Sequence, residues 1–204
     1  MSSSSKIQLT YFDFPGRGEL ARLIFTYGKV AFEDKRIQFQ DFPALKPTLP
    51  CGQLPVLNVD GKVYTQSAAI ARYAAKIAGL YPNDPLAALE ADSVVDAVVD
   101  ILLPIINAVW IEKDDTIQAQ KFDDISNVTL PKLLGALEAR AHTEGPFFDG
   151  EHATFADIYL FSLFHNTLRP LQDAKIKFSP QDYPKINSIV EKIHANPQIA
   201  AYLA

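Results

Sequence analysis

The sequence predicts an α/β domain with the element order βαβ-ββα, followed by an all-helical domain. Three observations support this fold class. Residues 6 to about 80 mix strand-like and helix-like patterns, the segment Tyr81-Pro82-Asn83-Asp84-Pro85 breaks all periodicity, and the patterns after it are helical. A chain of 204 residues is long enough for two small domains. We therefore expect one domain at residues 6–82 and a second at 86–204.

The first domain takes its element order from short segments of regular hydrophobic pattern. Strands are predicted at 7–12, 30–37, 56–59 and 62–65, and helices at 16–28 and 67–78. The Asp60-Gly61 pair between the last two strands is a hairpin signal. Gly28 is placed to end the first helix, and Ser67 to cap the first turn of the second.

The second domain reads as a succession of helices. They are predicted at 86–113 and 119–141, from Thr154, from Asp182 or Tyr183, and after Pro197. Pro131 is expected to kink or break the second of them. The pair Thr154 and Asp157 has the spacing of a capping box, which is a structural feature without chemistry of its own.

Composition excludes several classes of protein. Apolar residues make up 48% and charged residues 21%, which is ordinary for a folded globular chain. The net charge of −5 argues against a dedicated nucleic-acid binder. Cys51 is the only cysteine, so no disulfide forms within the chain, and a reducing cytoplasmic location is the natural expectation. The serine-rich start has no apolar signal core.

The most apolar stretch, Val94 to Ile111, is interrupted by Asp96, Asp100 and Pro104. A buried or interface helix fits this pattern better than a membrane span, so no membrane partner is expected. Asp92, Asp96 and Asp100 share one helical face at a spacing of four residues. A solvated face explains this ladder. Because two of the three lie in an apolar run, at least one can instead be aimed at a cation.

Two motifs in the first domain are open to both a structural and a ligand-binding interpretation. Leu54-Pro55 opens a predicted strand, either as a turn proline or as a cis peptide that presents the Leu54 backbone to a ligand. Gln66-Ser67 begins a predicted helix, where free N–H groups and the helix dipole favour an anion. Ser67 can serve as a cap, as part of such a site, or as both.

Tyr11 lies at the end of the first strand, before the loop that leads to Arg17 and the first helix. Ligands dock at the ends of strands in α/β folds, although a tyrosine there is by default a half-buried packing residue. The four histidines are scattered, without the spacing of metal ligands, so no metal site is predicted. Phosphate-binding, dinucleotide-binding and nucleophile-elbow motifs are absent from the sequence.

These pieces occur together and in order, and the chain from about Lys6 to Leu203 resembles the cytosolic glutathione transferases. The resemblance is carried by three segments: Leu9-Thr10-Tyr11-Phe12-Asp13-Phe14-Pro15-Gly16-Arg17-Gly18-Glu19, Gly52-Gln53-Leu54-Pro55-Val56-Leu57 and Gln66-Ser67-Ala68-Ala69-Ile70-Ala71-Arg72-Tyr73. The chain is most similar to the sigma-like group, which includes the haematopoietic type of prostaglandin D synthase. The resemblance implies a thioredoxin-like first domain, an all-helical second domain and a homodimer.

The resemblance also implies roles for residues. Tyr11 is the expected catalytic tyrosine, with Arg17 near the thiol, and Leu54-Pro55 is the expected cis bond. Glutathione, the co-substrate, is expected to contact these residues together with Phe42, Lys46, Gln53, Gln66, Ser67 and, from the neighbouring subunit, Asp100. Cys51 stands where some relatives place an aromatic residue that locks the dimer, so that style of interface is not expected.

The implied function is conjugation of the glutathione thiolate to small hydrophobic electrophiles, in detoxification. Phe12, Phe14, Trp110 and Tyr159 are candidates for the lining of the electrophile pocket. Two alternatives stay open. One is a glutathione-dependent isomerase of the prostaglandin-synthase type, against which Phe42 and Leu103-Pro104 depart from the pattern of that enzyme. The other is a non-catalytic ligand-binding or crystallin-like relative, which the intact Tyr11 and Arg17 disfavour.

Overall fold

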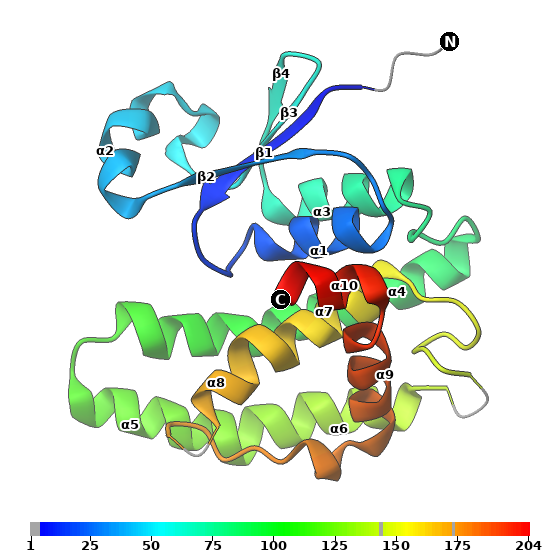
Figure 1. Ribbon diagram of the computed structural model, residues 1–204. Helices are drawn as coiled ribbons and strands as arrows, with labels where there is room; N and C mark the ends of the chain where they lie inside the picture. Colours follow the sequence, from blue (N-terminus) through cyan, green and yellow to red (C-terminus); the bar gives the residue numbers. More distant parts are fainter. Residues whose placement is uncertain (1–4, 143–144, 173) are drawn as a thin grey trace. The chain divides into compact units, whose positions relative to one another are not determined.

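The computed structural model describes residues 5–142, 145–172 and 174–204 (Figure 1). These residues form two compact units. Unit 1 comprises the chain up to Tyr81 together with Asn196–Ala204, and unit 2 comprises Pro82–Ala195. Unit 1 therefore ends inside the predicted linker. The last helix, expected in the helical domain, belongs to unit 1, because its buried Ile199 and its neighbours pack against the first helix.

A four-stranded sheet with the strand order β2-β1-β3-β4 forms the centre of unit 1. The strands are β1 (Ile7–Phe12), β2 (Glu33–Ile37), β3 (Val56–Val59) and β4 (Lys62–Tyr64). Strand β1 is parallel to β2 and antiparallel to β3, and β3 and β4 form an antiparallel hairpin. Asp60 and Gly61 both have positive φ, 51° and 90°, as the predicted two-residue turn requires. The predicted α/β fold class is confirmed.

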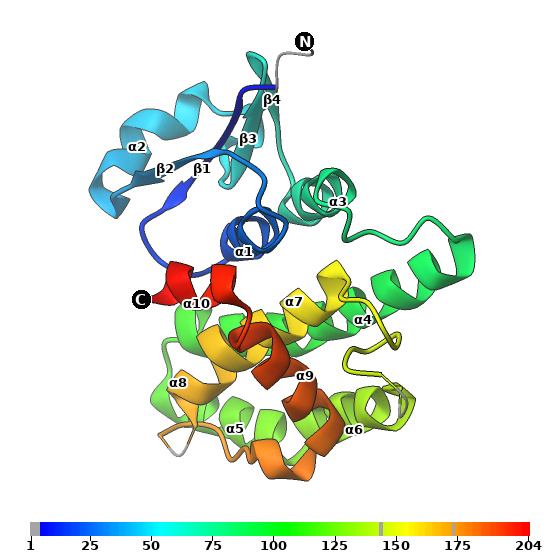
Figure 2. The same ribbon diagram turned by 45° about the vertical axis from the view of Figure 1, so that its right-hand side comes forward.

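Two helices, α1 (Glu19–Tyr27) and α3 (Ser67–Ile77), lie side by side on one face of this sheet (Figure 2). Helix α1 ends as predicted at Gly28, whose N–H donates to the Ile24 carbonyl. It begins at Glu19, later than predicted, because the residues before it form a loop. Strand β2 also begins later than predicted, because Lys29 turns with φ 55° where the chain leaves α1.

The segment between β2 and β3 is a chain of short helical turns. These are η1 (Phe39–Asp41), α2 (Phe42–Leu45), η2 (Lys46–Thr48) and η3 (Pro50–Gly52). In the last of them Cys51 and Gly52 have positive φ, 61° and 57°. This turn reverses the chain before Leu54 and Pro55, and thereby feeds β3 into the middle of the sheet.

Unit 2 is helical, as predicted. Its elements are α4 (Pro85–Ile106), η4 (Asn107–Ile111), α5 (Asp115–Asp124), η5 (Ile125–Thr129), α6 (Leu130–Arg140), α7 (Phe155–Leu163), η6 (Phe164–Leu168), α8 (Arg169–Leu171), η7 (Pro180–Asp182) and α9 (Pro184–His194). The interruption predicted at Pro131 is a π-helical turn, η5, which directly precedes it. Helix α10 (Pro197–Leu203) completes the chain.

Helix α7 is the core of unit 2 and packs against both α4 and α9. The predicted capping box at its start is confirmed. The Asp157 carboxylate accepts hydrogen bonds from the Thr154 backbone N–H and from the Phe148 backbone N–H, each at 2.7 Å. Because Asp157 is buried, these contacts fix the loop before α7 to the helix itself.

Helix α4 with η4 is long and apolar enough, by length and composition alone, to cross a membrane. Its apolar side chains nevertheless divide into a buried stripe and an exposed remainder. The stripe consists of Ala91, Val94, Val95, Val98, Ile101 and Ile105. Since this stripe packs in unit 2 against α7, the helix serves there as a core element.

We expect Asp157→Ala to lower the free energy of unfolding of the protein by about 2–6 kcal/mol. The alanine leaves the buried N–H donors of Phe148 and Thr154 without an acceptor, at about 1–3 kcal/mol each. Urea unfolding, followed by circular dichroism, measures the loss. The matched control is Asp124→Ala on the exposed side of α5. Equal stabilities of the two variants contradict the assigned role of Asp157.

Candidate active site

The predicted site residues of unit 1 meet at one end of the sheet. Tyr11 pairs with Arg36 of β2, and Thr10 pairs with Val56 of β3. Continuing the β1–β3 register by one residue places Pro55 beside Tyr11. Strand β4 ends at Tyr64, opposite Leu57, and Gln66 follows two residues later at the same end of the sheet. The Leu54–Pro55 bond is cis, as expected. The fold thus brings together segments that are 40 to 55 residues apart in sequence.

The Tyr11 side chain is 5% exposed, and its hydroxyl oxygen accepts a hydrogen bond from the Arg17 backbone N–H at 3.0 Å. Burial raises the pKa of this hydroxyl above its usual value of 10.0, which outweighs the lowering by the Arg17 contact. The phenol is therefore protonated at neutral pH. Since the contact from Arg17 uses the oxygen as acceptor, the hydroxyl proton is left to be donated to a ligand.

Two glycines let the loop after β1 approach Tyr11 closely. A Cβ atom added at Gly18 would lie 2.5 Å from Cγ of the Tyr11 ring, and one added at Gly16 would lie 2.7 Å from the hydroxyl oxygen. No side chain fits at either position without moving the ring. In the sequence these glycines are only parts of a motif. Their role follows from contacts that a linear pattern does not contain.

Arg22 was missed by sequence analysis altogether. Its side chain is 0% exposed and sits among the apolar residues of α1. The guanidinium donates to the carbonyls of Phe12 (3.0 Å) and Phe14 (3.2 Å), and pairs with Glu19 and Asp34. It therefore holds the backbone on both sides of Asp13, directly after Tyr11. The sequence signal was an arginine inside an apolar helical stripe, which demands buried partners.

Arg17, predicted near the reacting thiol, is exposed, and its hydrogen bond to Tyr11 comes from the backbone N–H. Its guanidinium charge also acts on Tyr11, where it lowers the pKa of the hydroxyl. The cation thus lies close enough to influence the tyrosine electrostatically. A role of this side chain toward a bound thiol stays a prediction.

The helical turns before β3 carry three further predicted residues. The Phe42 ring packs edge-on against Phe12, with centroids 5.2 Å apart. The Lys46 side chain runs along Gly52, where an added Cβ atom would lie 3.5 Å from its Cε atom. Lys46 and Gln53 are exposed, and Leu54 is partly buried. The contacts of these residues with a ligand stay a prediction.

The predicted cap at Ser67 is wrong. The N-cap of α3 is Gln66, with φ 75° and ψ 106°, and this helix start has no side-chain cap. Ser67 is already the first helical residue, because the chain turns sharply at Gln66 as it leaves β4. The first N–H groups of α3 therefore retain the capacity to bind an anion, and the ligand-binding interpretation of Gln66 and Ser67 remains.

Asp100 lies in an apolar run of the sequence, which suggests apolar surroundings for its side chain. Within a single chain this expectation is wrong. Asp96 and Asp100 are exposed on α4, on the side away from the stripe that includes Val98 and Ile101. Asp96 and Asp100 therefore lie on an exposed side of α4, whereas Asp92 is half-buried. Asp100 belongs to unit 2, and its predicted part in binding a ligand stays a prediction.

Aromatic rings surround the entrance to Tyr11. Phe12 stacks on Phe39 with centroids 4.5 Å apart, Phe14 stacks on Phe39 at 5.3 Å, and the Phe14 ring lies 5.7 Å from that of Tyr11. Phe39 is 59% exposed. Unit 1 thus has a cluster of stacked aromatic rings beside a buried hydroxyl donor. Trp110 and Tyr159, also predicted to line a pocket, belong to unit 2.

Within residues 5–142, 145–172 and 174–204, no three histidine, cysteine, aspartate or glutamate side chains gather as they do around a metal ion. Cys51 is a free, exposed cysteine.

Comparison with known proteins identifies two family domains. A model of the glutathione S-transferase N-terminal domain matches residues 7–76, and a model of the glutathione S-transferase C-terminal domain matches residues 99–204. The two matches together cover most of the chain. They agree with the division of the chain into an α/β unit and a helical unit.

Full-length relatives and solved structures agree with these matches. A haematopoietic prostaglandin D synthase of Gallus gallus is 35% identical over 198 residues, covering 96% of this chain and 94% of the relative. A glutathione S-transferase of Anopheles gambiae is 34% identical over 194 residues, covering 95% and 93%. The structure of prostaglandin synthase D of Nilaparvata lugens has a TM-score of 0.86 at 31% identity, covering 97% and 96%.

We expect Gly18→Ala and Gly135→Ala to change stability in opposite directions. At Gly18 the new methyl group overlaps the Tyr11 ring, and such overpacking lowers the free energy of unfolding by about 1–3 kcal/mol. At Gly135, inside α6, nothing lies within 4 Å of the new methyl, and alanine raises it by about 0.5–1 kcal/mol. Urea unfolding of both variants measures the difference. A Gly18→Ala protein as stable as the parent rules out the close packing on Tyr11.

Proposed function

This chain belongs to the glutathione S-transferase family, and on that premise we propose that it conjugates the thiolate of glutathione to small hydrophobic electrophiles in detoxification. The observation that carries the proposal is the hydrogen bond from the Arg17 N–H to the Tyr11 hydroxyl oxygen. It occupies that oxygen as an acceptor and leaves the phenolic proton for the sulfur of glutathione.

The chemistry follows from the donor. A free thiol with a pKa near 8.5 is mostly protonated at neutral pH. A hydrogen bond from Tyr11 to the thiolate contributes roughly 1.5–3 kcal/mol, which lowers the pKa of the thiol by about 1–2 units. The thiolate then attacks an electrophilic carbon. The thiol proton is released to water, and a carbon–sulfur bond forms. In a substitution the leaving group departs with the electron pair of the broken bond. In an addition the π electron pair moves to the neighbouring atom, which takes up a proton from water.

Binding of glutathione is proposed to follow the end of the sheet. Phe42, Lys46 and Gln53 hold the glycyl and central parts, and the cis Leu54–Pro55 segment lies beside Tyr11. Gln66, Ser67 and the uncapped start of α3 receive the γ-glutamyl carboxylate. An electrophile with an aromatic or apolar body rests on the surface formed by Phe12, Phe14 and Phe39.

A second candidate is a glutathione-dependent isomerase of the prostaglandin-synthase type. The relatives named as haematopoietic prostaglandin D synthases, at 35% and 36% identity, favour it. The Phe42 and Leu103-Pro104 departures from that enzyme's pattern disfavour it. Incubation with glutathione and a prostaglandin endoperoxide, with analysis of the products, separates the two. A panel of aromatic electrophiles separates both from a non-catalytic relative.

We further propose a sigma-like, cytoplasmic homodimer. The sigma-like class rests on the relatives just named. The dimer rests on the role inferred for Asp100, since a carboxylate on an exposed face of α4 can serve the glutathione site of a second copy. Cys51, small and exposed in an unusual turn, does not supply the large aromatic contact with which some relatives lock their dimers.

Replacing Tyr11 by phenylalanine is expected to lower kcat roughly tenfold or more and to shift the pH–rate profile by about 1–2 units to higher pH. The physical reason is the lost hydrogen bond to the thiolate, which is worth roughly 1.5–3 kcal/mol. Because the pKa of Tyr11 is raised, the phenol does not titrate in this range and the limb reports the thiol. Steady-state kinetics against pH measure the effect.

The contrasting variant is Ser67→Ala, for which the Michaelis constant for glutathione rises more than kcat falls. The γ-glutamyl carboxylate is remote from the sulfur, so the contact contributes mainly to uniform binding. If Tyr11→Phe keeps the parent kcat and pH profile, Tyr11 has no part in the chemistry.

Asp100→Asn is expected to weaken glutathione binding by roughly 1–3 kcal/mol without loss of the fold, because a charge-assisted contact to the glutamyl ammonium is removed. Mixing Asp100→Asn chains with Tyr11→Phe chains then creates heterodimers with one intact site, and part of the activity returns. Calorimetry measures binding, and activity after confirmed subunit exchange measures complementation. A protein that stays monomeric, or a mixture without recovery, rejects the shared site.

A further inference from the structure

A closed ring of side chains connects the C-terminal helix to the loop after β1. The Tyr202 hydroxyl of α10 donates to Oε1 of Glu19 at 3.0 Å and accepts from Nη2 of Arg36 at 3.2 Å. Helix α10 lies against α1 in both views (Figures 1 and 2), and both belong to unit 1. The last helix of the chain is thus bonded to the first helix and to strand β2.

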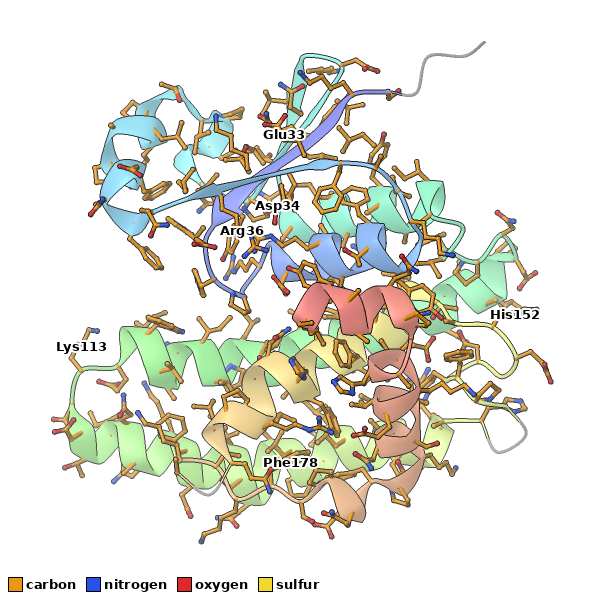
Figure 3. All side chains as sticks on the ribbon, viewed as in Figure 1. Glu33, Asp34, Arg36, Lys113, His152 and Phe178 are labelled. Atoms are coloured by element: carbon orange, nitrogen blue, oxygen red, sulfur yellow. The ribbon has the colours of Figure 1, made fainter. Side chains whose placement is uncertain are left out.

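The other half of the ring runs through two arginines and Asp34. Oδ2 of Asp34 accepts from Nε of Arg36 at 2.7 Å, and Oδ1 accepts from Nε of Arg22 at 2.9 Å. Arg22 then pairs through Nη1 with Oε2 of Glu19 at 3.2 Å, which closes the ring on the second oxygen of that carboxylate. Asp34 and Arg36, both labelled in Figure 3, lie two positions apart on β2.

Each carboxylate in this ring is held from two sides. Glu19 lies between Tyr202 and Arg22, and Asp34 lies between Arg22 and Arg36. Since Glu19 is only 4% exposed, an oxygen that loses its donor has little access to water in exchange. Burial also raises the pKa of the Tyr202 hydroxyl, so it remains a proton donor to Glu19 throughout the neutral range.

Arg22 connects this ring to the loop after β1, which carries Arg17. The same guanidinium that pairs with Glu19 and Asp34 donates to the carbonyls of Phe12 and Phe14. Those two carbonyls flank the start of the loop whose Arg17 N–H reaches the Tyr11 hydroxyl. The orientation of the Arg22 guanidinium therefore helps to set the position of the loop. Glu19, which Tyr202 holds in place, helps to set the orientation of that guanidinium.

We propose that Tyr202 is a positioning residue for the proposed conjugation reaction, acting through Glu19 and Arg22 on the loop that holds the Tyr11 hydroxyl. The inference rests on the proposed function for its kinetic consequence only. The C-terminal helix is then a working part of the thiol site in unit 1, although its tyrosine touches neither substrate nor Tyr11. Sequence patterns in the last turn of the chain gave no sign of this role.

The first test is Tyr202→Phe, which removes the hydroxyl group and keeps the aromatic part of the side chain. We expect kcat to fall two- to tenfold and the limb of the pH–rate profile to move to higher pH by about 0.3–1 unit, because a displaced Tyr11 stabilises the thiolate less. The Michaelis constant for glutathione is expected to stay within twofold, since the predicted binding residues are untouched.

The matched control is Tyr183→Phe. This tyrosine lies in unit 2 and packs against Phe178. The variant therefore loses a phenolic oxygen, as Tyr202→Phe does, but the network of Tyr202, Glu19 and Arg22 is unchanged. Its kcat and pH profile should equal those of the parent. A Tyr202→Phe protein that loses stability in urea but keeps the parent kcat and pH profile overturns the proposal, because Tyr202 is then only an anchor for α10.

A second measurement does not depend on catalysis. Hydrogen exchange of the Arg17 amide reports its bond to the Tyr11 hydroxyl directly, and we expect it to accelerate about tenfold or more in Tyr202→Phe. The Ile24 amide within α1 serves as the internal reference and should exchange as in the parent. Unchanged exchange at Arg17 rejects the positioning role, even where the proposed conjugation activity has itself failed.

A double-mutant cycle with Glu19→Gln tests the route. Glutamine keeps the shape of the side chain and an acceptor for Tyr202, but it weakens the pairing with Arg22. If both residues act through Arg22, the double variant loses less activity than the product of the two single losses. Independent, multiplicative losses show that Tyr202 does not act through Glu19.

Discussion

The structure of unit 1 depends on the ion pairs and hydrogen bonds of the buried Arg22 guanidinium. A cation without access to water is tolerated only where partners replace the lost hydration, and removal of one partner leaves an uncompensated charge. Arg22 has two carboxylates and two backbone carbonyls as such partners. These partners come from α1, from β2, from the last residue of β1 and from the loop after it, so satisfying one charge fixes all of these segments at once.

The geometry of Tyr11 is a consequence of that fixed loop. The loop presents one backbone N–H to the phenol oxygen, and its glycines allow the backbone to pack on the ring. Burial keeps the phenol protonated, and the direction of its accepted hydrogen bond leaves the proton available for the donation to the sulfur that we propose. A common residue thus becomes a specific donor through its surroundings, without an unusual charge of its own.

The two units solve the problem of buried polar groups in similar ways. In unit 2 the Asp157 carboxylate satisfies N–H groups from the loop before α7, as Arg22 satisfies carbonyls in unit 1. In both cases a single buried ionisable side chain ties an irregular segment to a helix. The C-terminal residues extend this principle, because Tyr202 joins the end of the chain to the charged network near its beginning.

Sequence patterns were enough to predict the α/β class of the first part of the chain, the helical class of the second, the Asp60-Gly61 hairpin and the capping box at Thr154. These features depend on local periodicity, turn chemistry and short spacings, which a linear pattern contains. The N-cap of α3 at Gln66, the exposure of Asp100, the place of α10 and the network around Arg22 became apparent only in the folded chain. Those features depend on which surfaces meet. A buried arginine or a tyrosine near the terminus acquires its partners from residues up to 183 positions away, and no local pattern records such contacts.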